Sequence, residues 1–160
     1  MGKLTQEQKE KSLAFLEKLI SFDTSVIRHG EDGQEKEAQL YMAEYLRQLG
    51  CSVDIFEPDN EKMKTYPGYN EGHSYVDRPN VVGRYKGSGG GKSLILNGHM
   101  DTMPSGDLAM WHTDPWTMTQ KEGKLYGLGT DDMKGGLSAL VLAMEFVLSE
   151  GFRPRGDIIL

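Results

Sequence analysis

The sequence has a single cysteine, Cys51, among its 160 residues, so no disulfide can form within the chain. It also lacks a long apolar run, because the longest, Leu137 to Leu148, is interrupted by Ser138 and Glu145 and is too short to cross a bilayer. The first residues are polar and charged where a secretory signal would need an apolar core. We therefore expect a cytoplasmic location and no membrane partner.

No block of like charges occurs, although the formal net charge is −6. Because phosphate binding needs a clustered basic surface, a nucleic-acid partner is not expected. A composition of 38% hydrophobic and 26% charged residues is that of a globular protein rather than of a disordered one. The last residues, Gly156-Asp-Ile-Ile-Leu160, are typical of a strand that is cut short, so we expect residues 1–160 to be part of a longer domain.

Apolar residues recur at helical spacing in three segments of the chain. The first segment opens with a capping box, in which Thr5 is the N-cap and Gln8 reaches back to it. Gly50 and Gly151 follow the second and third segments, where glycine commonly ends a helix. The predicted helices run over about 5–20, 34–49 and 133–150.

Four other segments are predicted to be strands: 53–56, 80–86, 93–98 and the last five residues. The glycine-rich stretch from Gly87 to Gly91 predicts a hairpin turn between the second and third of them. Lys92 and Ser93 give this stretch the look of a phosphate loop, but its spacing is one residue short and a strand follows it instead of a helix. Residues 58–79 and 100–124 are predicted to be loops, and the whole order of elements predicts a layered α/β sandwich.

An apolar segment runs straight into His99, and Asp101 follows two positions later. Side chains two apart on an extended chain project to the same side, so the imidazole and the carboxylate are expected to be neighbours. In open α/β sheets ligands bind at strand ends. The pair suits a metal-binding histidine that is oriented by a carboxylate behind it, although so short a pattern is also typical of two surface polar residues.

A second cluster, Gly127 to Gly136, places Asp131 and Asp132 among four glycines at the entry of the third predicted helix. Taken alone, the segment favours a simple helix cap. Together with His99, however, a carboxylate here could bridge two divalent cations about 3.5–4 Å apart, which make a strong hydrolytic centre. Spacing does not decide between Asp131 and Asp132.

Three motifs and a closing segment occur in a characteristic order. In this order the chain resembles the family of acetylornithine deacetylase, succinyl-diaminopimelate desuccinylase, aminoacylase and glutamate carboxypeptidase, and the resemblance covers most of its length. The segments that carry it are Gly98-His-Met-Asp101, Trp111-His-Thr-Asp-Pro-Trp116, Gly123 to Gly136 and Gly151 to Leu160. One departure is Leu128, where the family commonly has Arg, but this position is neither a ligand nor the base.

The resemblance implies a three-layer αβα sandwich around a mixed central sheet, of the zinc-exopeptidase kind, with residues 1–160 as the N-terminal part of its catalytic domain. It implies that His99 binds one metal ion, that Asp132 bridges two, and that Asp101 is the catalytic-site residue that orients His99. The ions would be two divalent metals, zinc first and cobalt as the alternative. A cis peptide is implied between Asp132 and Met133. The general base, the remaining ligands and a lid or dimerisation domain are implied beyond Leu160, so this part alone is expected to be inactive.

The implied activity is hydrolysis of an amide bond in an N-acyl amino acid or a related small substrate with a free carboxylate, by a water that two zinc ions activate. The full-length protein is then expected to be a homodimeric, cytoplasmic enzyme of amino-acid metabolism. Two alternatives stay open: a dipeptidase or carboxypeptidase of the same family, and a non-catalytic domain that retains the fold.

Several other residues that could carry chemistry are assigned simpler roles. His29 and His73 are expected to be exposed to solvent, and Trp111 and Trp116 to pack their loop onto the domain. His112 is a candidate for the wall of a substrate cleft. For Lys134 the sequence leaves two interpretations, a cleft residue or a solvated lysine at a helix start.

Overall fold

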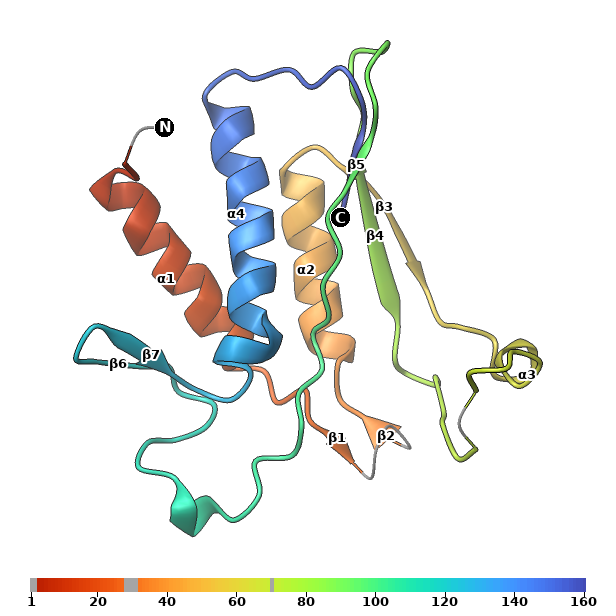
Figure 1. Cartoon of the computed structure of the whole chain (residues 1–160), viewed down its shortest axis with the longest axis vertical. Helices are drawn as coiled ribbons and strands as arrows, with labels where there is room; N and C mark the ends of the chain where they lie inside the picture. The colour runs from red at the N-terminus through yellow and green to blue at the C-terminus, as the bar shows by residue number, and fades with distance from the viewer. Residues whose placement is uncertain (1–2, 28–31, 70) are drawn as a thin grey trace.

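The computed structural model describes residues 3–27, 32–69 and 71–160, so His29 lies outside the described residues. Within this part of the chain no helix is both long and apolar enough to cross a membrane. Figure 1 shows the elements, which in chain order are α1 (Gln6–Ile20), β1 (Val26–Ile27), β2 (Asp32–Gly33), α2 (Lys36–Gln48), β3 (Ser52–Phe56), α3 (Asn60–Met63), β4 (Asn80–Tyr85), β5 (Leu94–Ile95), η1 (Leu108–Met110), β6 (Thr119–Lys121), β7 (Lys124–Tyr126), η2 (Thr130–Lys134), α4 (Gly135–Ser149) and β8 (Ile158–Ile159).

The three predicted helices are confirmed as α1, α2 and α4, and their ends follow from local chemistry. At the start of α1 the backbone N–H of Gln8 donates to Thr5 Oγ1 at 3.1 Å, and the backbone N–H of Thr5 donates to the Gln8 side chain at 2.9 Å. This is the predicted capping box. Gly50 and Gly151 have positive φ values of 87° and 83°, which glycine adopts without steric cost at a helix end.

The central sheet has the strand order β3-β4-β8-β5. Strands β3, β4 and β8 pair antiparallel, whereas β5 pairs with β8 in parallel, so the sheet is mixed. The predicted hairpin between β4 and β5 is therefore wrong, because the last strand of the chain lies between them. The glycines admit the chain segment that leads into β8: a Cβ on Gly91 would lie 2.6 Å from the backbone N of Gly156, and a Cβ on Gly87 would collide with the Gly156 carbonyl.

Helices α1, α4 and α2 lie together on one side of this sheet (Figure 1). The core forms where they meet each other and the sheet, and its fully buried side chains include Leu19, Leu46, Val141 and Met100. On the opposite face of the sheet Phe56, Val82 and Ile95 are exposed. The α/β fold around a mixed sheet is thus confirmed, and the helices in the described part of the chain cover one face of it. Burial in this core also raises the pKa of the Cys51 thiol to about 11.

Short elements occur inside the two segments that were predicted to be loops. Between residues 58 and 79, Asp59 caps the single turn of α3 by accepting from the backbone N–H groups of Glu61 and Lys62. At the end of the second segment β6 and β7, which extends to Tyr126, form a hairpin whose two turn residues, Glu122 and Gly123, have φ values of 52° and 73°. Two consecutive positive φ values are those of the tight turns that join antiparallel strands.

Candidate metal centre

His99 and Asp101 lie on the extended segment that follows β5. This segment runs beside the residues that lead into β1: the backbone N–H of Thr102 donates to the Thr24 carbonyl at 3.0 Å, and the N–H of Val26 donates to the Thr102 carbonyl at 2.9 Å. Met100, between the two polar residues, is 2% exposed. Because side chains alternate along an extended chain, a buried Met100 turns both His99 and Asp101 toward the surface.

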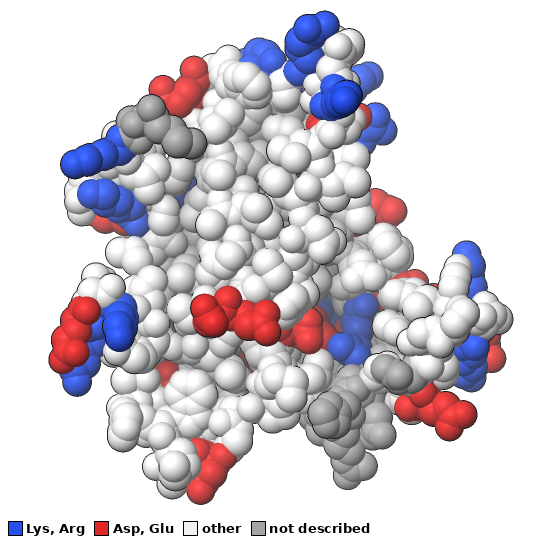
Figure 2. Space-filling view, in the orientation of Figure 1, with Lys and Arg blue, Asp and Glu red and all other residues white. Residues whose placement is uncertain are grey.

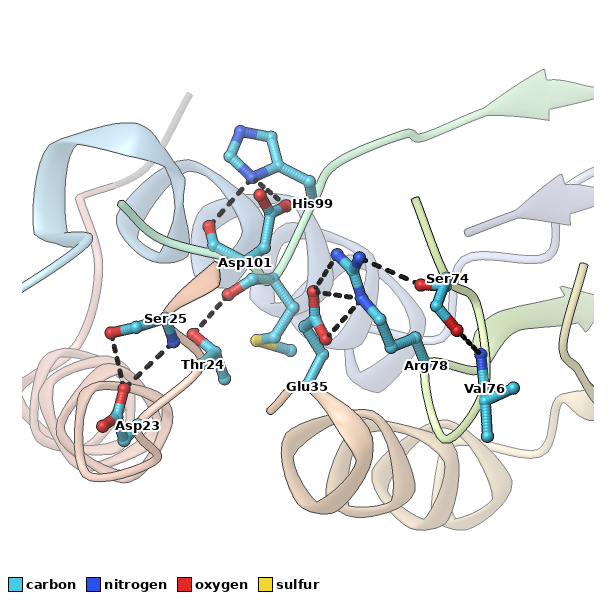
Figure 3. A network of polar contacts seen from close by, with 10 residues as sticks. Asp23, Thr24, Ser25, Glu35, Ser74, Val76, Arg78, His99 and Asp101 are labelled. Carbon is cyan, nitrogen blue, oxygen red and sulfur yellow. Dashed lines mark hydrogen bonds and ion pairs between the residues drawn. The ribbon is translucent and has the colours of Figure 1, made fainter. Parts of the chain in front are cut away.

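The His99 imidazole lies between two carboxylates, and each of its nitrogens faces one of them. Nδ1 is 3.0 Å from Asp101 Oδ1 and 3.2 Å from the Asp101 carbonyl oxygen (Figure 3). Nε2 is 2.9 Å from Asp132 Oδ1. Two acceptors at Nδ1 favour the tautomer that carries its proton there, which leaves the lone pair of Nε2 directed at Asp132.

The donor set fits a metal ion. A neutral imidazole nitrogen and a carboxylate oxygen that face each other at 2.9 Å are two lone-pair donors, and a proton or a cation is needed to hold them together. Imidazole nitrogen and carboxylate oxygen are also the ligands that zinc accepts in hydrolytic sites. Figure 2 shows acidic side chains gathered across the middle of the face that it displays.

Asp132 projects from η2, the turn that leads into α4. Its φ and ψ of −127° and 98° are not helical, and the peptide bond between Asp132 and Met133 is cis, as expected. Helix α4 begins at Gly135 with Lys134 as its N-cap residue, and no side chain caps it by a hydrogen bond. The interpretation of Asp131 and Asp132 as simple helix caps is therefore wrong.

The turn before Asp132 packs closely against the segment that carries Asp101. Gly129 has a φ of 78°, and a Cβ placed on it would lie 2.5 Å from Thr102 Cγ2. Only glycine therefore fits this position, for reasons of both conformation and space. The close packing explains how two segments about thirty residues apart in the sequence bring His99 and Asp132 into contact.

Lys134 is buried, which corrects both interpretations left by the sequence. It is 1% exposed, and its Nζ donates to the Phe22 carbonyl at 2.8 Å. Burial lowers its pKa to about 8. A side chain so enclosed is neither a solvated lysine nor part of a cleft wall, and no local signal in the sequence distinguishes it from an ordinary exposed lysine.

An ion pair beside the centre was also missed. Arg78 Nη2 lies 2.6 Å from Glu35 Oε1, and Arg78 Nη1 donates to the Ser74 carbonyl at 3.3 Å (Figure 3). Both ion-pair residues line a pocket of about 170 Å³ that His99 and Asp101 also line. Hydrogen bonding to Glu35 raises the pKa of Arg78, so the guanidinium stays charged next to the centre.

The remaining candidates lie around these groups. His112 is exposed and lines a pocket of about 650 Å³ together with Trp111, Tyr126 and Asp131, the neighbour of Asp132. Trp111 Nε1 donates to the Ser105 carbonyl at 2.8 Å, which ties its loop together as expected. The last candidate, His73, is half-buried rather than fully exposed.

In the part of the chain that the structure describes, no three or more His, Cys, Asp or Glu side chains converge on one metal position. The pair of His99 and Asp132 is thus a partial ligand set. Their contact is what the sequence led us to expect, and their roles as ligands, like that of Asp101 behind His99, remain predictions.

Comparison with known proteins gives the same family as the motifs. Residues 95–160 match the family described as Peptidase family M20/M25/M40. The chain is 33% identical over 164 residues to N-formyl-4-amino-5-aminomethyl-2-methylpyrimidine deformylase of Bacillus subtilis, covering 100% of this chain and 34% of that protein. It is 48% identical over 63 residues to succinyl-diaminopimelate desuccinylase of Polaromonas naphthalenivorans, covering 39% of this chain and 16% of that protein.

The fold has relatives among solved structures. An M20 family metallo-carboxypeptidase from Sulfolobus solfataricus superimposes with a TM-score of 0.70 at 19% identity, over 94% of this chain and 30% of the other. The motifs point to the same family as the match of residues 95–160, and the superposition shows that the fold is shared. Residues 95–160 of the chain are thus similar to the peptidase family M20/M25/M40. All of this chain aligns with the deformylase, but it spans only about a third of the length of that protein.

Proposed function

We propose that the protein that contains this chain hydrolyses an amide bond in an N-acyl amino acid or a related small molecule with a free carboxylate, with two divalent metal ions at the centre described above. Zinc is the proposed metal and cobalt the alternative. The observation that carries the proposal is the arrangement of His99, with one nitrogen on Asp101 and the other facing Asp132. The names of the two relatives agree with it, since a deformylase and a desuccinylase each remove an acyl group.

The chain's own residues would do three things in this reaction. Asp101 accepts a hydrogen bond from the Nδ1–H group and fixes the ring, so the lone pair of Nε2 is held toward the centre. Asp132, whose side chain is 84% exposed, keeps both carboxylate oxygens available for two ions. Bound divalent ions would supply Lewis acidity, by which an amide carbonyl is polarised and the pKa of a water is lowered. The general base that the family resemblance implies is not His99, Asp101 or Asp132, so we propose that residues 1–160 alone are inactive.

A metal and substrate survey of the full-length protein tests this function. We expect about two zinc ions per chain, and turnover of N-formyl, N-acetyl or N-succinyl compounds that is faster than turnover of unblocked dipeptides. Elemental analysis and a panel of paired substrates would measure both. Faster cleavage of dipeptides would favour a dipeptidase, whereas zinc near zero with no turnover would favour a non-catalytic domain that retains the fold.

The role of Asp101 can be tested by Asp101→Asn, which keeps the shape of the side chain. An amide is a weaker acceptor than a carboxylate and can hold the wrong tautomer of His99, so we expect metal affinity or kcat to fall by about 10–100-fold. Asp107→Asn is a suitable control, because Asp107 caps η1 and makes no contact with the imidazole. Equal effects of the two substitutions, measured by metal titration and steady-state kinetics, would contradict the orienting role.

A further inference from the structure

The candidate metal centre combines two parts of the chain, the segment with His99 and Asp101 and the turn η2 with Asp132. Both parts are attached to the same short stretch, residues 22–26, which connects the end of α1 to β1. We call residues 22–26 the brace segment. Its contacts with each part come from different residues, so they can be altered separately.

The brace segment holds the first part on both sides of Asp101. Thr24 Oγ1 donates to the Met100 carbonyl at 2.7 Å, and the Thr24 carbonyl accepts from the backbone N–H of Thr102 at 3.0 Å. Thr24 is 0% exposed, so water does not compete for these bonds. The backbone that presents Asp101 and the adjacent His99 is therefore fixed by residues immediately before and after Asp101.

The second part is attached to the brace segment through Lys134. This residue is two positions after Asp132, and its Nζ donates to the carbonyl of Phe22, the first residue of the brace segment. Its aliphatic stem passes close to Gly129, where a Cβ would lie 3.3 Å from Lys134 Cδ. One side chain thus spans the turn from its glycine to the brace segment.

Burial of this ammonium group is unfavourable in itself. Removing an ammonium group from water is strongly unfavourable unless the group is hydrogen-bonded or paired. The Phe22 carbonyl lies just past the C-terminal end of α1, where the helix dipole favours a cation and offsets part of that cost. An apolar side chain of similar length would fill the same space without that cost, so packing alone does not account for a lysine here.

We propose that Lys134 is a positioning residue of the metal centre, which sets the approach of Asp132 to His99 by binding the Phe22 carbonyl. The brace segment then sets the position of both parts relative to each other, because Thr24 fixes the backbone around Asp101 and Phe22 fixes the turn with Asp132. This inference rests on the proposed function, because it assumes that His99 and Asp132 bind metal together.

The substitution Lys134→Met in the full-length protein tests the inference, because methionine keeps most of the volume and loses the donor and the charge. We expect the affinity for Zn²⁺ alone, measured by competition with a chromophoric chelator, to fall at least about tenfold. We also expect kcat to fall while KM stays nearly constant, because the ligands are displaced and the substrate contacts are not. Lys134→Gln, which retains a hydrogen-bond donor, should give intermediate values.

The matched control is Val141→Ala in α4, the helix that follows Lys134. Val141 is 0% exposed, so its truncation lowers the melting temperature, and it removes neither of the hydrogen bonds by which Thr24 and Lys134 hold the two parts. We expect this variant to keep the Zn²⁺ affinity of the wild type. Unchanged affinity in Lys134→Met, equal effects of the Met and Gln variants, or a loss that Val141→Ala reproduces at similar stability would overturn the positioning role. A wild-type protein that binds no Zn²⁺ would instead contradict the proposed function.

A double substitution tests whether the two attachments act through one segment. Thr24→Val removes the hydroxyl that binds the Met100 carbonyl and keeps the shape of the side chain. If both parts are positioned through the brace segment, the effects of Lys134→Met and Thr24→Val depend on each other. The loss of Zn²⁺ affinity in the double variant should then differ from the product of the two single losses. If the two losses of Zn²⁺ affinity simply multiply in the double variant, the two parts are not positioned through one segment.

Discussion

The substitution His99→Ala is expected to remove metal from the full-length protein and to abolish nearly all of its hydrolytic activity. His99 offers its Nε2 toward Asp132 at 2.9 Å, whereas alanine offers no ligand at all. Outer partners of metal ligands typically contribute about 10–100-fold, so the loss of a ligand itself should exceed about 100-fold in kcat. Metal content by elemental analysis and kcat on the best substrate of the panel would measure both effects.

His112→Ala provides the matched control for this prediction. His112 is an exposed histidine that lines the same pocket as Asp131. We expect its substitution to leave metal content unchanged, with at most a change in KM. Unaltered metal content in His99→Ala, or an equal loss in both variants, would show that His99 is not a ligand.

The parts of this fold that could be predicted from the sequence are those in which nearby residues determine the structure. The capping box of Thr5 and Gln8 depends on residues three apart, and it is present at the predicted place. The side-by-side placement of His99 and Asp101 follows from the geometry of an extended chain, and it also agrees with the structure. Such features need no knowledge of the remaining fold.

Strand pairing was predicted less well, because it depends on residues far apart in the chain. The glycines between β4 and β5 satisfied the rule for a local hairpin, but β8, more than sixty residues later, occupies the position between these strands. The rule considers only strands that are neighbours in the sequence, so it cannot predict that a strand from far along the chain will pair between them. The glycine signal itself was sound, since Gly91 is needed where Gly156 approaches.

The polar residues around the centre, Lys134, Arg78 and Glu35, were also not predicted to be buried or paired. Lysine, arginine and glutamate are mostly exposed in proteins, so sequence alone placed Lys134, Arg78 and Glu35 at the surface or left them unremarked. The structure buries Lys134 against Phe22, more than a hundred residues earlier, and pairs Arg78 with Glu35 across 43 residues. These partners are far away in the sequence and are brought together only by the tertiary fold.

The substitution Asp132→Asn addresses the other half of the centre. The family resemblance selected Asp132 over Asp131, and in the structure it is Asp132 that contacts the imidazole. An amide keeps the size of the side chain but has one oxygen and no charge, so it cannot bridge two cations. We therefore expect the loss of at least one metal ion per chain and a decrease in kcat of more than about 100-fold.

The neighbouring substitution Asp131→Asn separates this effect from a general change in charge. Both variants remove one negative charge from the same turn, but Asp131 lines the adjacent pocket and does not contact His99. We expect Asp131→Asn to retain both metal ions and to affect only KM or substrate preference. If instead Asp131→Asn lost metal while Asp132→Asn kept it, the bridging role would belong to Asp131. Similar losses in both would point to the summed charge of the turn, because a bridging ligand acts through its own two oxygens.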